Sequence, residues 1–362
     1  MAYTTIDDPS AHFQALTYTG NATNRTLTFD GNSDLQADWF WFKERNASSN
    51  WHQLYDTSRG IGTSSAPRLF TNDASAEENI TNGSGVRSVG TNSVDIGTTA
   101  GVNGNTNTLV LWAWKANGGT TSSNTDGDIT TTVQTNSTAG FSIITYTGNG
   151  NNLDTIGHGL GATPDFAVVK QRSSSSNTLR WFVKVPVVCG NSEILEWDTN
   201  NAKGDSGNGI ETMSSSTITL GIDTGNANAT NESSATYVCY AFKNIQGYSK
   251  IGKYTGNASA DGPFVYTGFK PAWVMVKRTD SGSSWEIVDN KRSPINVIDK
   301  SLYADLNDSE YSFNNFDFLS NGFKLRNASS SEANNISGGT YIYMAFAEHP
   351  FVSSKGVPVT AR

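Results

Sequence analysis

The sequence is poor in charged residues and in cysteine, and each shortage excludes a class of protein. Charged side chains make up 16% of the 362 residues, and no segment gathers lysine and arginine into a cluster. Clustered cations are what bind a phosphate backbone, so we expect no nucleic-acid binding. Cys189 and Cys239 are too few for a disulfide framework. We expect both to be small buried apolar side chains.

Long apolar runs are also missing. No stretch approaches the roughly 18 apolar residues of a membrane-spanning helix. The first residues, MAYTTIDD, have neither the positive charge nor the apolar segment of a secretory signal. We therefore expect a chain that starts in a cytoplasm and inserts in no membrane.

Threonine, serine, asparagine and glycine take the place of the missing charges, together with an aromatic content of 11%. That many aromatic residues is atypical of a disordered polar chain. The combination favours many short strands joined by tight turns.

Three diverged copies of one unit account for most of the chain. The tetrapeptide YTGN begins at Tyr18, Tyr146 and Tyr254, and 23–25 residues later a short apolar run closes with lysine. These runs are residues 39–43 (WFWFK), 166–170 (FAVVK) and 273–277 (WVMVK). An aromatic-rich segment ends each copy, at residues 109–115, 237–243 and 341–347. The interval from the first tyrosine to the central alanine of that segment is 95, 95 and 91 residues, which indicates an internal repeat.

The repeated unit predicts an all-β fold: three tandem β-sandwich, jelly-roll-like repeats of about 105 residues each. The lysine-closed runs are apolar at successive positions, as in a strand that is covered on both faces. No segment is convincingly helical.

The predicted domains are repeat 1 at residues 1–117, a linker plus repeat 2 at 118–245, and repeat 3 with a C-terminal tail at 246–362. Residues 117–124 (NGGTTSSN) have the composition of a flexible linker. The second junction, residues 243–247, is shorter, so we expect repeats 2 and 3 to be coupled more rigidly than repeats 1 and 2. Whether the repeats form a row or a cluster stays open.

Three segments carry a resemblance: residues 3–14 (YTTIDDPSAHFQ), 29–39 (FDGNSDLQADW) and 157–165 (GHGLGATPD). With them the chain resembles, over nearly its whole length, a family of repeat-bearing structural proteins of marine tailed phages, including cyanophages. Repeat 3 departs from the pattern, since residues 266–271 (YTGFKP) lack the HGLG form. The resemblance implies a location on the tail or capsid of a virion, and it implies no catalytic residues.

Motifs that could carry catalysis or bind a metal are weak. Residues 204–207 (GDSG) resemble the nucleophile loop of trypsin-like proteases, but the following residues differ, and neither His52 nor His158 has the neighbours of the required base. The histidines form no zinc-binding pair. The acidic segments 126–128, 198–205 and 305–310 lack calcium-loop spacing, although a structural calcium stays open. No acid pair is marked for glycoside cleavage, so we expect no enzyme, no metal site and no cofactor.

One tryptophan in each copy could stack on a sugar ring: Trp51, Trp181 and Trp285. The alternative, which we expect to be more frequent, is a core residue of a cross-strand ladder. The polar loops beside them, residues 46–50, 173–177 and 279–283, differ between copies. A lectin with one site per repeat would repeat its polar residues, so this variation favours a scaffold that is reused for different contacts.

These observations predict a structural component of a phage virion, a tail-fibre or tail-associated subunit that mediates particle assembly and contacts the host surface. The alternatives are a capsid decoration protein and a glycan-binding module without catalysis. The expected partners are other virion proteins, further copies of the chain in a homo-oligomer, and a host-surface glycan. The expected location is the virion, assembled in the cytoplasm of the bacterial host.

Overall fold

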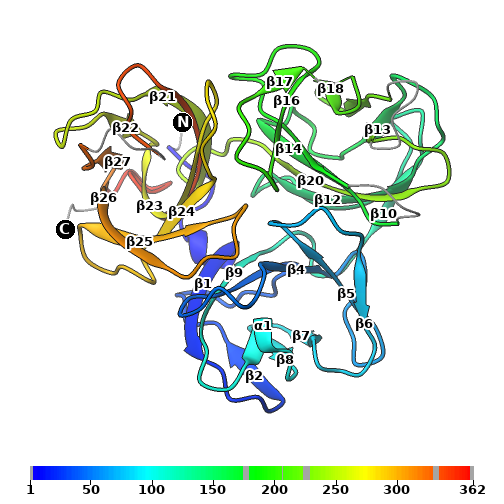
Figure 1. The fold of residues 1–362 in the computed structure, drawn as a ribbon, viewed down its shortest axis with the longest axis horizontal. Helices are drawn as coiled ribbons and strands as arrows, with labels where there is room; N and C mark the ends of the chain where they lie inside the picture. Colours follow the sequence, from blue (N-terminus) through cyan, green and yellow to red (C-terminus); the bar gives the residue numbers. More distant parts are fainter. Residues whose placement is uncertain (1–2, 174–178, 206, 223–228, 329–333, 359–362) are drawn as a thin grey trace.

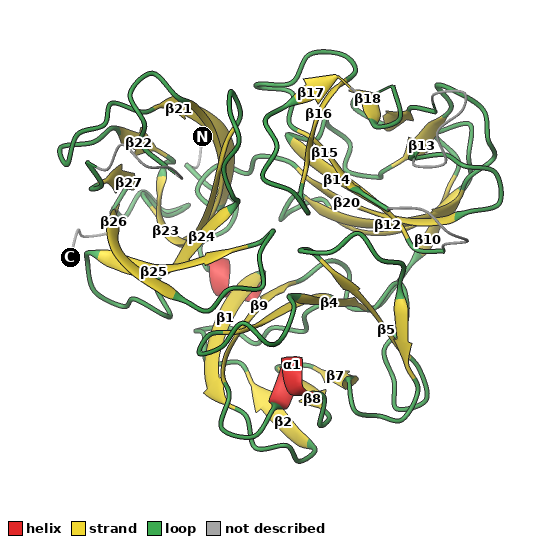
Figure 2. Cartoon of the chain, viewed as in Figure 1, coloured by secondary structure: helices red, strands yellow, loops and turns green. Residues whose placement is uncertain are grey.

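Three β-units lie around a common centre in the computed structural model, which describes residues 3–173, 179–205, 207–222, 229–328 and 334–358 (Figure 1). Strands take up 45% of the chain and helices 2%, and Figure 2 shows that the two helices are single short turns. The prediction of an all-β fold with three sandwich units is confirmed. No helix in these residues is long and apolar enough to cross a membrane.

Unit 1 packs a six-stranded sheet, in the order β1-β9-β3-β4-β5-β6, against a three-stranded sheet, β2-β8-β7. All neighbouring strands are antiparallel. The elements are η1 (Pro9–Ala11), β1 (Phe13–Thr19), β2 (Arg25–Thr28), β3 (Trp39–Glu44), β4 (Gln53–Asp56), β5 (Ala66–Phe70), β6 (Glu78–Ile80), β7 (Val86–Gly90), β8 (Ser93–Ile96), α1 (Ala100–Asn103) and β9 (Thr108–Trp114).

Unit 2 repeats this architecture and adds two strands at one edge. Its large sheet has the order β10-β11-β12-β20-β14-β15-β16-β17, and its small sheet is β13-β19-β18. The strands are β10 (Ser122–Asn124), β11 (Thr131–Asn136), β12 (Phe141–Thr147), β13 (Thr155–Gly157), β14 (Phe166–Gln171), β15 (Trp181–Lys184), β16 (Glu193–Glu196), β17 (Gly204–Asp205), β18 (Ile210–Met213), β19 (Thr217–Leu220) and β20 (Thr236–Phe242).

Unit 3 joins the two layers into one curved sheet, because the long strand β26 reaches from one layer to the other. The order is β21-β28-β23-β24-β25-β26-β27-β22, and the unit is nearly barrel-shaped. The strands are β21 (Ser249–Thr255), β22 (Phe264–Tyr266), β23 (Phe269–Arg278), β24 (Glu286–Asp289), β25 (Ile298–Tyr303), β26 (Tyr311–Leu319), β27 (Gly322–Leu325) and β28 (Thr340–Pro350).

The lysine-closed strands are buried on both faces because each of them lies between two cores, one that belongs to its own unit and one that all three units share. In β3, Phe40 and Phe42 point into a core that belongs to unit 1 alone. Their neighbours Trp39 and Trp41 point the other way, into a core that all three units share. Successive strand residues face opposite sides of a sheet, so a strand between two cores must be apolar at every position.

The shared core is rich in aromatic rings that cross the unit boundaries. The ring of Trp39 in unit 1 lies 4.9 Å from that of Tyr240 and 5.7 Å from that of Phe141, both in unit 2. Trp114 of unit 1 meets Trp273 of unit 3 edge-on at 5.7 Å. The three repeats therefore form a cluster around one interior, which settles the question that the sequence left open.

The repeated YTGN tetrapeptide closes one end of each unit. Its tyrosine hydroxyl donates a 2.6 Å hydrogen bond to a backbone carbonyl, that of Val102, Thr230 or Asn334 in the three copies. The backbone N–H of the tetrapeptide's asparagine donates to a buried asparagine amide, at Asn103, Asn231 and Asn335. The repeated tetrapeptide therefore has a structural role, and we call these hydrogen bonds the YTGN lock.

The segment expected to be a flexible linker is held in place, and that prediction was wrong. The backbone N–H groups of Gly118 and Gly119 donate to the Asp38 carboxylate at 2.9 and 2.7 Å. Residues 122–124 form β10, which pairs with β11. Hydrogen bonds to a carboxylate of unit 1 thus hold this segment in place, although its composition alone predicts a flexible linker.

Residues before β1 close the ring of units by reaching back to unit 3. The Tyr3 hydroxyl donates to the Gly268 carbonyl at 2.8 Å, and the Thr4 hydroxyl donates to the Gln246 carbonyl at 2.8 Å. Figure 1 shows the N-terminus beside β21, next to the last unit in the chain. The first and last units are therefore joined by direct hydrogen bonds.

Candidate functional site

The three tryptophans predicted as stacking candidates occupy different environments. Trp51 is 39% exposed, whereas Trp181 and Trp285 are fully buried. A buried indole has no face to offer a sugar, so the idea of one stacking platform per repeat does not hold for Trp181 and Trp285. Both are core residues, the alternative that the sequence left open.

The strand pairing also shows that Trp51 is not their structural counterpart. Lys170 lies opposite Trp181, and the register of β23 and β24 places Lys277 opposite Trp285. The register of β3 and β4 places Lys43 opposite His52, one residue after Trp51. His52 is the third member of the set, and it is fully buried.

These three buried rings sit at the interfaces between units and follow one another around the molecule. The Trp181 indole N–H of unit 2 donates to the Phe70 carbonyl of unit 1 at 2.9 Å. The Trp285 indole N–H of unit 3 donates to the Glu196 carbonyl of unit 2, also at 2.9 Å. The His52 ring of unit 1 faces backbone groups of Tyr303 in unit 3.

Phe70, Glu196 and Tyr303 are themselves equivalent by register, since they lie opposite Gln53, Phe182 and Glu286. The same strand position is thus the contact at all three interfaces. The units are related by an approximate threefold rotation, in which each ring reaches the next unit.

A buried ion-pair network fills the interface between units 1 and 2. The Arg59 guanidinium pairs with Asp56 at 2.5 Å and with Glu77 at 2.8 Å, and the Asp56 and Arg59 side chains are fully buried. Arg172 of unit 2 pairs with the same Glu77 at 2.8 Å. The Tyr240 hydroxyl of unit 2 donates to Asp56 at 2.7 Å. Burial raises the pKa of this hydroxyl well above its ordinary value, so it stays a donor.

The interface between units 3 and 1 repeats this network with equivalent residues. Arg292 pairs with Asp289 at 2.6 Å and with Glu310 at 3.1 Å, and Arg45 of unit 1 pairs with Glu310 at 2.8 Å. The Trp112 indole of unit 1 takes the place of the tyrosine hydroxyl and donates to Asp289 at 3.0 Å.

The interface between units 2 and 3 replaces the inner part of the network with apolar side chains. Register places Val185 where the other units have Asp56 and Asp289, and Val188 follows at the position of the arginine. Met344 occupies the position of the donor Tyr240. The hydrogen-bond donor, the aspartate and the arginine of the other interfaces are therefore all replaced by apolar residues here. This is expected because a single buried charge without its partner is costly.

Each lysine-closed strand places a buried ammonium group near an interface. Lys43 donates to the Asn307 carbonyl of unit 3 at 2.8 Å, and Lys277 donates to the Asn200 carbonyl of unit 2 at 3.2 Å. Lys170 donates to the Leu179 carbonyl of its own unit. Desolvation lowers the pKa of Lys170 to about 7 and those of Lys43 and Lys277 to about 8.

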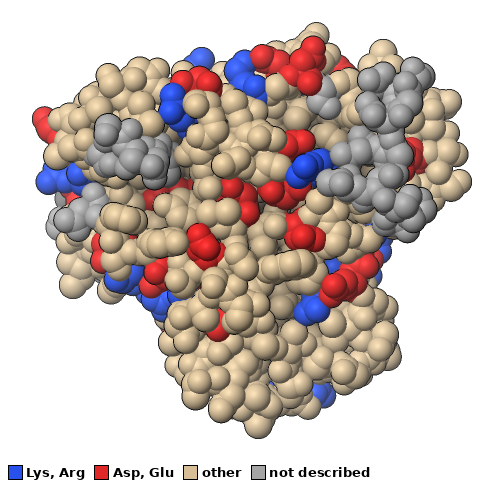
Figure 3. All heavy atoms as spheres, viewed as in Figure 1, with Lys and Arg blue, Asp and Glu red and all other residues tan. Residues whose placement is uncertain are grey.

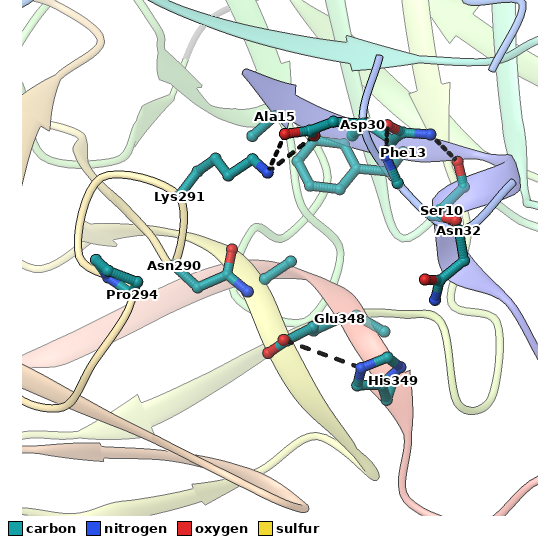
Figure 4. Close-up of a pocket in the computed structure, with 14 residues that line it drawn as sticks. Ser10, Phe13, Ala15, Asp30, Asn32, Asn290, Lys291, Pro294, Glu348 and His349 are labelled. Atoms are coloured by element: carbon teal, nitrogen blue, oxygen red, sulfur yellow. Dashed lines mark hydrogen bonds and ion pairs between the residues drawn. The ribbon is translucent and has the colours of Figure 1, made fainter. Parts of the chain in front are cut away.

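A cavity of about 350 Å³ opens at the interface between units 1 and 3 (Figure 4). Figure 4 shows Lys291 reaching toward Asp30 on one side, while Glu348 and His349 lie together on the other. Lys291 donates to both Asp30 carboxylate oxygens at 2.8 Å. The Glu348 carboxylate lies 3.9 Å from the His349 ring and forms an ion pair with Lys270.

The charged groups of this cavity therefore have partners of opposite charge, Lys291 with Asp30 inside the cavity and Glu348 with Lys270 beside it. Its serine, Ser10, donates to Asp8 at 2.6 Å, and no hydrogen bond among the described residues joins it to His349. An oriented serine–histidine pair, which acyl transfer requires, is not formed here. The cavity offers polar groups for a small ligand and no arrangement suited to nucleophilic catalysis.

The other candidates from the sequence are structural where they can be described. His158 is buried, accepts from the Leu160 N–H at 3.1 Å and faces the Ser214 carbonyl at 3.3 Å, as expected for a satisfied turn residue. Cys189 and Cys239 are free and buried, as predicted. Ser206 of the GDSG segment and residues 174–177 lie outside the described residues. Within the described ranges, no three His, Cys, Asp or Glu side chains are grouped to hold a metal.

One comparison with known proteins gives a match. A family model described as a domain of unknown function (DUF7483) matches residues 8–350. No curated protein and no solved structure matches the chain. The matched span includes all three units, so this family model describes the assembled three-unit block rather than a single repeat.

Proposed function

The chain belongs to the DUF7483 family, and we propose that it is a non-enzymatic structural subunit of a phage virion, tail-associated, that joins other virion proteins. It works as a closed homo-oligomer or as an array on the particle. The observation that carries the proposal is the single interior shared by three repeats. One chain thereby makes a pseudo-threefold block instead of a flexible string of domains.

The interfaces support a load-carrying role for this block. Ion pairs buried at two interfaces and aromatic contacts across the shared core join units that are far apart in sequence. Opening any interface exposes apolar rings, and opening either of the two interfaces with buried ion pairs also exposes unpaired charges; both cost free energy. A subunit that transmits force or spaces other proteins benefits from this rigidity.

The resemblance of residues 3–14, 29–39 and 157–165 to structural proteins of marine tailed phages supports the virion as the location. The surface is compatible with contacts of several kinds. Figure 3 shows that the lower end of the lobe formed by unit 1 carries few charged side chains on this face, while charged groups lie nearer the centre of the molecule and over units 2 and 3. Different faces of one block can thus meet different partners.

Cryo-electron microscopy of purified particles, with this structure fitted to the map, tests the proposal. Density at the tail in a closed ring of copies is the expected result. Density spread over the capsid lattice makes the chain a decoration protein and overturns the tail assignment. Absence of the chain from the particle, checked by mass spectrometry of the same preparation, overturns the structural role altogether.

A further inference from the structure

The strongest unassigned feature is a groove on unit 3, beside its interface with unit 2. Its volume is about 430 Å³, and its aromatic lining is Tyr303, Tyr311 and Phe313. Asp308 and Ser283 add polar groups, and Asn200 of unit 2 closes one side. We call this feature the Tyr311 groove.

The aromatic rings of the groove are exposed and aligned with each other. Tyr311 is 39% exposed and Phe313 is 54% exposed. Their ring centroids are 6.4 Å apart and their planes are within 23° of parallel. Tyr303 lies 5.9 Å from Tyr311 at an angle of 58° and forms a wall.

The fold does not require these rings, as the other two units show. Tyr311 lies opposite Ser301, and the equivalent positions in units 1 and 2 are Glu78 and Gly204. The framework therefore accepts an acid or a glycine there. Two neighbouring exposed aromatic rings gain little from folding, so a contact with a ligand or partner accounts for them better than stability does.

The polar groups of the groove determine the class of ligand. The Tyr311 hydroxyl donates to Asp308 at 3.1 Å, which places a carboxylate at the edge of the rings. Asp308 is the one charged residue among the described lining residues, and no lysine or arginine is among them. A ligand with apolar faces and hydroxyl edges fits this lining, and an anionic ligand would find no cation to pair with.

We propose that the Tyr311 groove binds a neutral hexopyranose unit of a polysaccharide, with a C–H face of the sugar on the aromatic rings and a hydroxyl donating to Asp308. The inference adds a ligand to the proposed virion subunit. Its test does not depend on where the subunit sits in the particle, so the two proposals can fail separately.

The test is affinity electrophoresis of the full chain in native gels that contain a neutral glucan, galactan or mannan, with alginate as an acidic polysaccharide. At least one neutral polymer should retard the protein. The double variant Tyr311→Ala/Phe313→Ala should bind that polymer about tenfold more weakly or worse. Phe264→Ala removes an aromatic ring of unit 3 that is 47% exposed and outside the groove, and it should bind like the unchanged protein.

Two outcomes overturn the inference. The first is retardation by none of the neutral polymers, whether or not alginate retards the protein, and the second is retardation that the double variant retains. Trp51→Ala provides a further check, because Trp51 packs edge-on against Phe70 at 5.1 Å in a second groove, on unit 1. Loss of binding in Trp51→Ala but not in the double variant would move the sugar to unit 1. Circular dichroism of each variant confirms that a loss of binding is not a loss of fold.

Discussion

At the scale of single residues, the buried Asp56–Arg59 pair gives the sharpest test of how the units hold together. Arg59 is the main partner of the Asp56 carboxylate, and both side chains are fully buried. Arg59→Met leaves that carboxylate with only the Tyr240 hydroxyl and backbone contacts. We expect the free energy of unfolding to fall by about 3–5 kcal/mol, measured by denaturant titration, because an uncompensated buried charge is costly.

A matched control for this variant is Lys291→Met, which removes an exposed ion pair with Asp30. Exposed pairs contribute about 0–1 kcal/mol, so this variant should differ little from the unchanged protein. Equal losses in the two variants would contradict a special cost of burying Asp56.

The interface between units 2 and 3 suggests how the loss can be repaired. The triple variant Asp56→Val/Arg59→Val/Tyr240→Met introduces the side chains that stand at Val185, Val188 and Met344. It should recover at least half of the stability lost in Arg59→Met, because apolar replacement of a whole buried ion pair is often neutral or stabilising. A triple variant no more stable than Arg59→Met would show that the interfaces are not interchangeable.

The buried lysines predict a pH dependence of stability. The pKa of Lys170 is lowered from its ordinary value near 10.5 to about 7. Between these values the unfolded chain binds the proton and the folded chain does not, so stability rises with pH across this window. We expect the melting temperature to increase from about pH 7 to 8.5, below the range in which tyrosine titrates.

Lys170→Met should flatten this pH dependence, and Lys253→Met, which removes an exposed lysine, should leave it unchanged. Differential scanning fluorimetry at a series of pH values gives both slopes. An equal slope in the unchanged protein and in Lys170→Met would mean that Lys170 keeps its proton in the folded state over this range.

At the scale of elements, the YTGN lock explains why its glycine recurs. A Cβ at Gly148 would lie 2.2 Å from the Glu232 carbonyl oxygen, and a Cβ at Gly20 or Gly256 would lie 2.1 or 2.2 Å from a backbone carbonyl oxygen. Gly148→Ala should therefore destabilise the protein by about 1–3 kcal/mol in chemical denaturation, the usual cost of overpacking. Gly204, with open space around it, is the control, and Gly204→Ala should change stability by no more than about 0.5 kcal/mol.

The sequence predicted the strands better than it predicted their partners. Residues 39–43, 166–170 and 273–277 are apolar at successive positions, which correctly indicated strands covered on both faces. The pairing of Trp51 with Trp181 and Trp285 was off by one residue, because similarity of residue type is not register. The hairpin loops that follow Lys43, Lys170 and Lys277 differ in length, and loop length sets which residue lies opposite the lysine.

The Tyr311 groove was hidden from the sequence for a related reason. Tyr303, Tyr311 and Phe313 come together because β25 and β26 form a hairpin and Tyr311 and Phe313 share one face of β26. The alternation of Tyr311 and Phe313 was a signal for a shared face. Their exposure could not be read, since in the other units the same strand positions carry Glu78 and Gly204.

At the scale of the whole molecule, the repeat was visible in the sequence but the arrangement of the repeats was not. The composition of residues 117–124 indicated a flexible connection, yet Asp38 and β11 hold that segment. Such contacts join residues about 80 positions apart, and composition does not encode them. The arrangement does explain why residues 39–42 are apolar at every position: Trp39 and Trp41 are buried on one face of the strand and Phe40 on the other, which requires a second core.

The shared core leads to a prediction about unfolding. Domains with separate cores unfold in separate transitions, whereas three units around one interior should unfold together. Scanning calorimetry of the full chain should show one transition, with van't Hoff and calorimetric enthalpies in a ratio near one.

A variant in the shared core tests the same idea. Trp39→Ala leaves a cavity in the shared core, where Trp39 contacts Tyr240 and Phe141, and it should lower the free energy of unfolding by about 3–5 kcal/mol. Because Trp39 belongs to unit 1 but supports unit 2, the whole transition should move to lower temperature without splitting. Three resolved transitions, or a shift of one component alone, would show that the units are independent domains in contact.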